Sequence, residues 1–154
     1  FSLNAHYYRG DCEVKSSFYE EAARDFEYVI NQTQNKFTEK SLVALGGIYR
    51  QLNKKEEAIA VYKNLQATAS RKENIRSSEI NLMQLYFEQE YYESASVYAN
   101  IILSQEVVAE SLWQQAKLTL AKTNYKKEQY EIFKNPILTT SFYFFLSIWS
   151  SNKR

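Results

Sequence analysis

The stretch LGGIYRQLNKKEEAIAVYKNL, residues 45–65, describes a helix, a short turn and a second helix. Together with Leu42, three residues before the stretch, the first helix has an apolar face at positions three and four residues apart: Leu42, Leu45, Gly46 and Tyr49. A polar run at residues 53–56 interrupts this pattern, and a second face follows: Ala58, Tyr62 and Leu65. Because the turn is short, we expect the helices to lie antiparallel, with Gly46 and Ala58 permitting a close crossing.

The same helix–turn–helix pattern recurs along the chain. Gly10 precedes Gly46 by 36 residues (46 − 10 = 36), and Ala22 precedes Ala58 by the same interval. Tyr86 follows Tyr49 by 37 residues (86 − 49 = 37). Further matches extend the pattern: Phe26 with Tyr62, Val29 with Leu65, Leu82 with Leu45, and Ala95 with Ala58. We therefore expect the second helix of the third unit to direct three residues toward the core: Ala95, Ala99 and Ile102.

A fourth copy is expected to be incomplete. Its first helix places Leu120 and Ala121 where the template has Leu and Gly, and Gln129 imitates the start of a second helix. The small-residue position then falls on Phe133, and Pro136 disfavours helical geometry at the residue before it. We predict an array over residues 1–134 and an irregular apolar segment over 135–154, with repeat units at 3–34, 38–70, 75–106 and 110–134.

The composition of the 154-residue chain favours helices, because it has only three Gly and one Pro to form the turns of a strand-rich fold. A net charge of +1 lacks the basic excess of a nucleic-acid binder. Cys12 is the only cysteine, so an intramolecular disulfide and a Cys-rich zinc site are excluded. We expect Cys12 to be a small buried residue, because His6, the only histidine, does not share its helical face. We predict no cofactor, no metal site and no enzymatic activity.

These repeated residues resemble the tetratricopeptide repeat (TPR) family. The strongest match is Leu45, Gly46, Tyr49, Ala58 and Tyr62, and a second is Leu82, Tyr86, Tyr92 and Ala95. The first unit has Glu13 where a large aromatic residue is usual, and the spacing exceeds the usual ~34 residues. The resemblance implies an all-α fold, a right-handed superhelix of antiparallel helix pairs, and a function in protein–protein recognition.

Phrases such as YYRGDCE and NLMQLYFEQEYYESASVYA also resemble large repeat proteins of the Bacteroidota cell envelope. That resemblance implies a periplasmic or outer-membrane-associated setting and a longer parent chain. Because the chain starts with Phe1 rather than Met, we interpret it as a fragment or a mature chain.

The family resemblance implies that the first helices line a concave groove for a protein or peptide partner. Through the motif, the groove positions become Tyr7, Asp11, Val14, Val43, Gly47, Arg50, Ile80, Gln84, Phe87, Leu118, Lys122 and Tyr125. Aromatic residues among them would supply anchor surface, and Arg50 or Lys122 would hold a carboxylate. The alternative is a structural spacer within a larger envelope protein, without a ligand groove.

The apolar end of the chain leaves three interpretations open. Residues 142–149 are too short to span a bilayer, which needs about 20 residues, so we expect no membrane insertion. The segment could fold back as a cap over the last apolar face, pack against a second copy of the chain, or be foreign to the parent repeat array.

Overall fold

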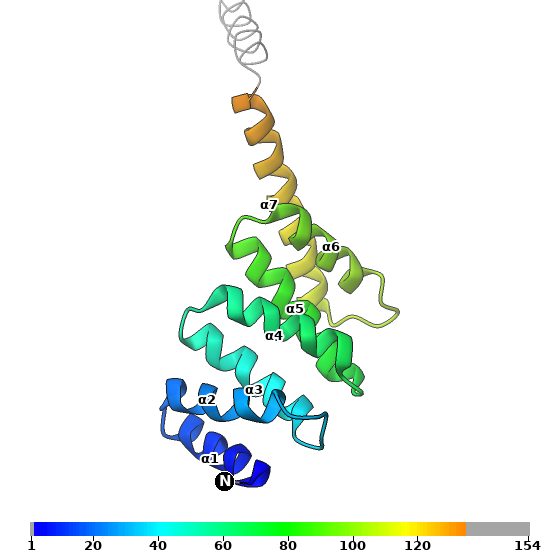
Figure 1. Ribbon diagram of the computed structural model, residues 1–154. Coiled ribbons are helices and arrows are strands. Elements are labelled where there is room, and N and C mark those ends of the chain that lie inside the picture. Colours follow the sequence, from blue (N-terminus) through cyan, green and yellow to red (C-terminus); the bar gives the residue numbers. More distant parts are fainter. Residues whose placement is uncertain (1, 135–154) are drawn as a thin grey trace, which may run out of the picture.

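The computed structural model describes residues 2–134, and the regular elements in this range are all helices. They are α1 (Leu3–Lys15), α2 (Tyr19–Ile30), α3 (Thr38–Gln51), α4 (Lys55–Thr68), α5 (Lys72–Glu88), α6 (Tyr92–Leu103) and α7 (Glu110–Lys134). Each helix packs chiefly on its neighbours in the sequence, so the chain forms an elongated stack from α1 to α7 (Figure 1). The all-α prediction is confirmed for these residues. The predicted apolar cap at 135–154 and its self-association lie outside them.

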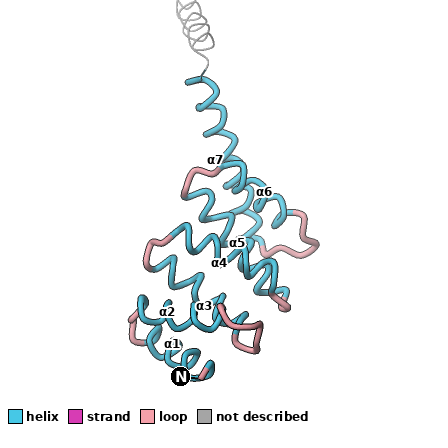
Figure 2. Tube along the Cα trace, in the orientation of Figure 1, coloured by secondary structure: helices cyan, strands magenta, loops and turns pink. Residues whose placement is uncertain are grey.

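The turns inside the first three helix pairs, coloured as loops in Figure 2, share a positive-φ residue and a hydrogen bond across it. Each contains one residue with a positive φ: Ser17 at 63°, Asn53 at 55° and Glu90 at 63°. The next amide in each turn donates across that residue to a helix carbonyl: Phe18 to Glu13 at 2.9 Å, Lys54 to Tyr49 at 2.8 Å, and Tyr91 to Tyr86 at 2.9 Å. This bond satisfies a carbonyl that the helix end would otherwise leave unpaired. The repeat seen in the side chains is therefore also present in the backbone.

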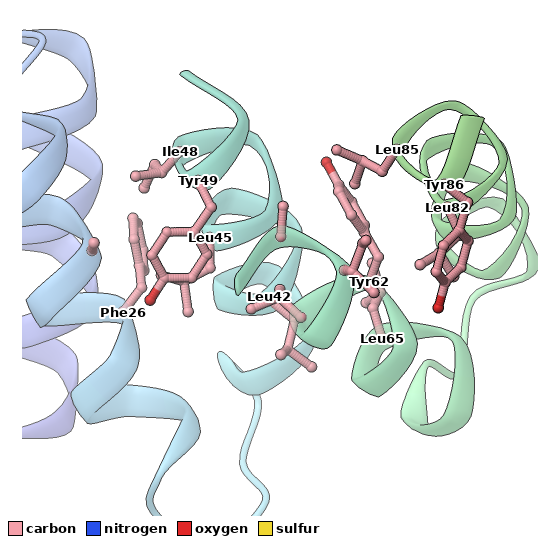
Figure 3. Packing of buried hydrophobic residues seen from close by; sticks show 14 of the residues in the cluster. Phe26, Leu42, Leu45, Ile48, Tyr49, Tyr62, Leu65, Leu82, Leu85 and Tyr86 are labelled. Atoms are coloured by element: carbon pink, nitrogen blue, oxygen red, sulfur yellow. The ribbon is translucent and has the colours of Figure 1, made fainter. Parts of the chain in front are cut away.

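The predicted inward faces form the core. Leu45 is 0% exposed and Leu42 and Leu65 are each 1% exposed, in one cluster that extends from α2 to α6. Figure 3 shows this cluster passing from Phe26 on α2 to Tyr86 on α5. Ala95, Ala99 and Ile102 are fully buried, as predicted. Each large apolar side chain that is fully buried contributes about 1.5–3 kcal/mol, so this continuous cluster stabilises the stack of pairs.

A glycine and an aromatic ring fit together in the first two pairs. A Cβ at Gly46 would lie 2.6 Å from the Tyr62 ring, and one at Gly10 would lie 3.1 Å from the Phe26 ring. In the third pair the corresponding positions hold Met83 and Ala99, both 0% exposed. The large residue has therefore moved to the first helix and the small one to the second. This exchange keeps the volume between the helices roughly constant, which close-packed interiors require.

The fourth unit differs from its prediction in two respects. A second helix does not begin at Gln129, because α7 continues unbroken to Lys134. At the small-residue position predicted for this unit, the sequence has Phe133 in place of the alanine of the first three pairs.

The inward face of α7 also lies one residue from the predicted position. Ala121, expected in the close-packed small-residue place, is exposed. Thr119 and Thr123 are buried instead, each 37 residues after Leu82 and Tyr86 (119 − 82 = 37; 123 − 86 = 37). The placement of Leu120 and Ala121 was therefore wrong by one residue. Continuing the 37-residue interval between the second and third units into the fourth gives the observed register.

Candidate partner-binding face

Alternate helices α3 and α5 carry six of the predicted groove residues at helical spacing, and Ile80 is one of them. We call the surface that the other five form the first-helix face: Val43, Gly47, Arg50, Gln84 and Phe87. Residues 43, 47 and 50 follow one another at i, i+4 and i+7 on α3, and residues 84 and 87 lie at i and i+3 on α5. Hydrogen bonds between side chains of α3 and α5 hold the two helices next to each other on this surface.

Arg50 is the centre of these bonds. Its Nη1 donates to Asn81 Oδ1 at 3.0 Å and to Gln84 Oε1 at 3.1 Å, and its Nη2 donates to Glu88 Oε1 at 3.4 Å. Lys55 Nζ lies 3.3 Å from the other oxygen of Glu88. The guanidinium is thus held in place, and Glu88 balances part of its charge. A partner carboxylate at Arg50 would have to compete with Glu88.

The space above Gly47 is open. A Cβ built there meets no atom within 4 Å, unlike one at the neighbouring Gly46. Val43, one helical turn earlier, is 39% exposed, which is unusual for a valine in a packed helix. The two residues leave a shallow apolar strip beside Arg50, where a partner backbone could approach α3 closely.

Phe87 extends the face toward α7. Its half-buried ring packs edge-on against Tyr92, with the centroids 6.0 Å apart. Lys122 Nζ of α7 lies 6.0 Å from the same ring centroid, at the outer limit of a cation–π contact. The structure therefore brings the predicted residues together in two pairs, Arg50 with Gln84 and Phe87 with Lys122.

The other predicted groove residues serve different roles or lie apart. Tyr7 stacks on Phe37 with centroids 4.4 Å apart, and Asp11 pairs with Lys15 at 2.7 Å. Val14 and Ile80 pack against the apolar clusters. On α7, Leu118 and Tyr125 are 53% and 58% exposed. The one-residue shift of this helix moves the positions equivalent to the groove to Lys117, Ala121 and Asn124.

Three hollows in the described surface lie away from this face. Hollows of about 340 and 260 Å³ lie beside the starts of α5 and α3, and another of about 440 Å³ lies between α1 and α2. None of these three is lined by a residue of the first-helix face.

Sequence reasoning missed two side chains that fasten the loops between helix pairs. The carboxylate of Glu39 accepts hydrogen bonds from Asn74 Nδ2 at 2.6 Å, from the Ser70 hydroxyl at 2.7 Å and from the amides of Ser70 and Arg71. These bonds, led by that from Asn74, lower the pKa of Glu39 to about 2.

Arg76 stands 37 residues later (76 − 39 = 37) and has the opposite charge. It donates to the Gln105 side chain and to the backbone carbonyl of Val107. Equivalent positions in two units thus hold a loop by hydrogen bonds. Glu39 accepts from the backbone amides of its loop, and Arg76 donates to a backbone carbonyl of the other. Only the 37-residue interval could have pointed to this pairing, since the two residue types differ.

Cys12 is exposed, which corrects the prediction that it is buried. It lies on α1, whose face away from α2 is uncovered in the first pair. Within residues 2–134, no three His, Cys, Asp or Glu side chains come close enough to hold a metal ion. Among the helices described, none combines the length and hydropathy needed to cross a bilayer.

Comparison with known proteins assigns no family to the chain. No protein-family model matches the chain, and no curated protein matches it.

Proposed function

We propose that this protein is a TPR-like helical-repeat module that binds a segment of another protein along the first-helix face. The observation that carries the proposal is the open apolar strip at Val43 and Gly47, directly beside the fixed guanidinium of Arg50. Such a strip offers backbone access, apolar contact and an oriented cation within one helical span. These are the elements from which peptide-binding surfaces are built. The module has no catalytic role in this proposal.

A structural spacer is the second candidate. It is favoured by the bonds of Arg50 to Asn81, Gln84 and Glu88, since a side chain that joins two helices needs no external ligand. In a spacer, the face would contribute rigidity rather than affinity. The two proposals differ in what happens when the space above Gly47 is filled.

Gly47→Trp distinguishes them. The substitution places a large side chain in open space, so the helix pair stays folded while the strip is blocked. Ala60→Trp is the matched control, because Ala60 is exposed on α4, outside the first-helix face. Partners captured by the wild-type protein from the cells that produce it are then titrated against both variants. Binding lost only with Gly47→Trp supports the module; equal binding by both variants refutes it in favour of the spacer.

A further inference from the structure

The α1 end of the stack carries a cluster of charged and polar side chains. Asp25 on α2 is 2% exposed and accepts hydrogen bonds from Nε and Nη2 of Arg9 on α1. His6 Nδ1 lies 2.9 Å from Asp25 Oδ1, and Arg9 Nε lies 3.7 Å from Glu13 Oε1. Together with Glu21, Arg24 and Tyr28, these residues line the hollow of about 440 Å³ between the two helices.

The charges of this cluster are partly balanced within it. The hydrogen bonds from Arg9 hold the pKa of Asp25 below its usual range. Burial, followed by the nearby charge of Asp25, raises the pKa of Glu13. The Asp25 carboxylate is stable here because Arg9 donates two hydrogen bonds to it. Covering these charged groups with an apolar surface from another molecule would cost free energy.

The interior pairs use the same four positions for apolar contact. Residues 36 positions later than the cluster members are Leu42, Leu45, Tyr49 and Val61, each at most 8% exposed. In the third pair, three of the four positions are again apolar or aromatic: Leu82, Tyr86 and Tyr98. The fourth, Glu79, accepts a hydrogen bond from Gln105 at 3.0 Å.

These interior positions face the second helix of the preceding pair. The Tyr49 hydroxyl of α3 donates to Glu27 on α2. At the equivalent position of α5, the Tyr86 ring lies 5.6 Å from Lys63 Nζ on α4, and the Tyr98 hydroxyl donates to Gln66 of that same helix at 3.2 Å. His6, Arg9, Glu13 and Asp25 therefore occupy the surface where a preceding helix pair would pack, and the hollow between α1 and α2 is the space its second helix would fill.

We infer that His6, Arg9, Glu13 and Asp25 form a polar end cap that closes the α1 face to the stacking of a second copy of the chain. Self-association of the described array would then proceed only through other surfaces. The inference concerns the chemistry of this face. It does not depend on partner binding by the first-helix face.

The test replaces the cap with the residues of the interior pair: His6→Leu, Arg9→Leu, Glu13→Tyr and Asp25→Val. In both the capped and the replaced protein, Cys12→Ser removes the exposed native thiol and Glu21→Cys places a new one at the rim of the hollow. We expect oxidation to give several-fold more disulfide-linked dimer in the replaced protein, because its end is now apolar. Equal yields from the two folded proteins would overturn the inference.

A second comparison decides the matter if the replaced protein does not fold. In the capped protein, the Glu21→Cys thiol is compared with an Ala67→Cys thiol on the exposed side of α4, both in the Cys12→Ser background. The inference predicts no more dimer from residue 21 than from residue 67 at the highest concentration reached. Preferential crosslinking at residue 21 would show that the α1 end does associate, and would contradict it.

Discussion

The Tyr62 ring on α4 packs directly against the backbone of Gly46 on α3. A Cβ on residue 46 would lie 2.6 Å from two carbon atoms of the tyrosine ring. Real Cβ atoms do not approach other atoms so closely, and the ring is 5% exposed with little room to move. The distance between these two helices is therefore set by the absence of one methyl group.

The three glycines of the chain form a graded series. Gly46→Ala should lower the free energy of unfolding by about 1–3 kcal/mol through overpacking. Gly10→Ala should cost less, because its Cβ would meet the Phe26 ring at 3.1 Å. Gly47→Ala should instead stabilise the protein by about 0.5–1 kcal/mol, since alanine favours the helix and the space is open. Urea denaturation of the three variants measures this order; a Gly46→Ala variant as stable as Gly47→Ala would contradict it.

The exchanged pair in the third unit predicts a rescue. Gly46→Met alone overfills the contact, and Tyr62→Ala alone leaves a cavity, so each should destabilise the protein. Together they reproduce the arrangement of Met83 and Ala99. The double variant should be more stable than the sum of the two single effects predicts, by about 0.5–3 kcal/mol of coupling. A double-mutant cycle from urea denaturation checks this, and strictly additive effects would count against equivalent packing in the two units.

Glu39 predicts a pH dependence of stability. Its pKa falls from 4.5 to about 2 on folding, so the unfolded chain binds the proton more tightly than the folded chain. The stabilisation is therefore fully present above about pH 4.5 and is lost as the pH falls toward about 2. Glu39→Gln should lower the melting temperature at neutral pH and make little difference at the acid end of that range. Glu106→Gln is the control, because Glu106 is an exposed residue in a loop. If the melting temperatures of wild type and Glu39→Gln changed in parallel with pH, the role of the carboxylate would be disproved.

Thr123 occupies the place of the buried tyrosines on α7. Its side chain is 0% exposed, and its hydroxyl has no hydrogen-bond partner among the described residues. Thr123→Val removes the unpaired hydroxyl while keeping the shape, so it should stabilise the protein by about 1 kcal/mol. Thr119→Val is the matched control, because the Thr119 hydroxyl donates to the Gln115 carbonyl at 3.0 Å and should give no such gain. Thermal unfolding of the two variants compares them; destabilisation by Thr123→Val would mean that its hydroxyl is paired.

Much of the fold was predictable because helical period and repeat interval reinforce each other. Leu42, Leu45, Tyr49, Leu82 and Tyr86 were identified as core from spacing alone, and the alanines at 22, 58 and 95 indicated where the helices cross. The shift in α7 was missed because Leu120 and Ala121 imitate the Leu–Gly pair more closely than Thr119 and Leu120 do. In α7, residue type and repeat interval therefore indicate different registers, and the interval gives the one observed.

The candidate face was less predictable from sequence. A motif identifies which side of a helix points outward, but it does not reveal that Arg50 bonds to three side chains of the next first helix or that Tyr7 stacks on Phe37. Those contacts depend on the distance and rotation between helices, which many small packing terms determine together. For the same reason, the sequence did not predict the hydrogen bonds that Glu39 accepts from the next loop, or the polar cluster around Asp25.

Site-specific photocrosslinking tests the central claim, partner binding on the first-helix face, most directly. A photoreactive amino acid replaces Val43, which is exposed on that face, or Ala67, which is exposed on α4 away from it. After irradiation in the producing cells, the account predicts one dominant crosslinked protein from residue 43 and none above background from residue 67. The same crosslinked products from both positions, or none from residue 43 while residue 67 reacts, would contradict it.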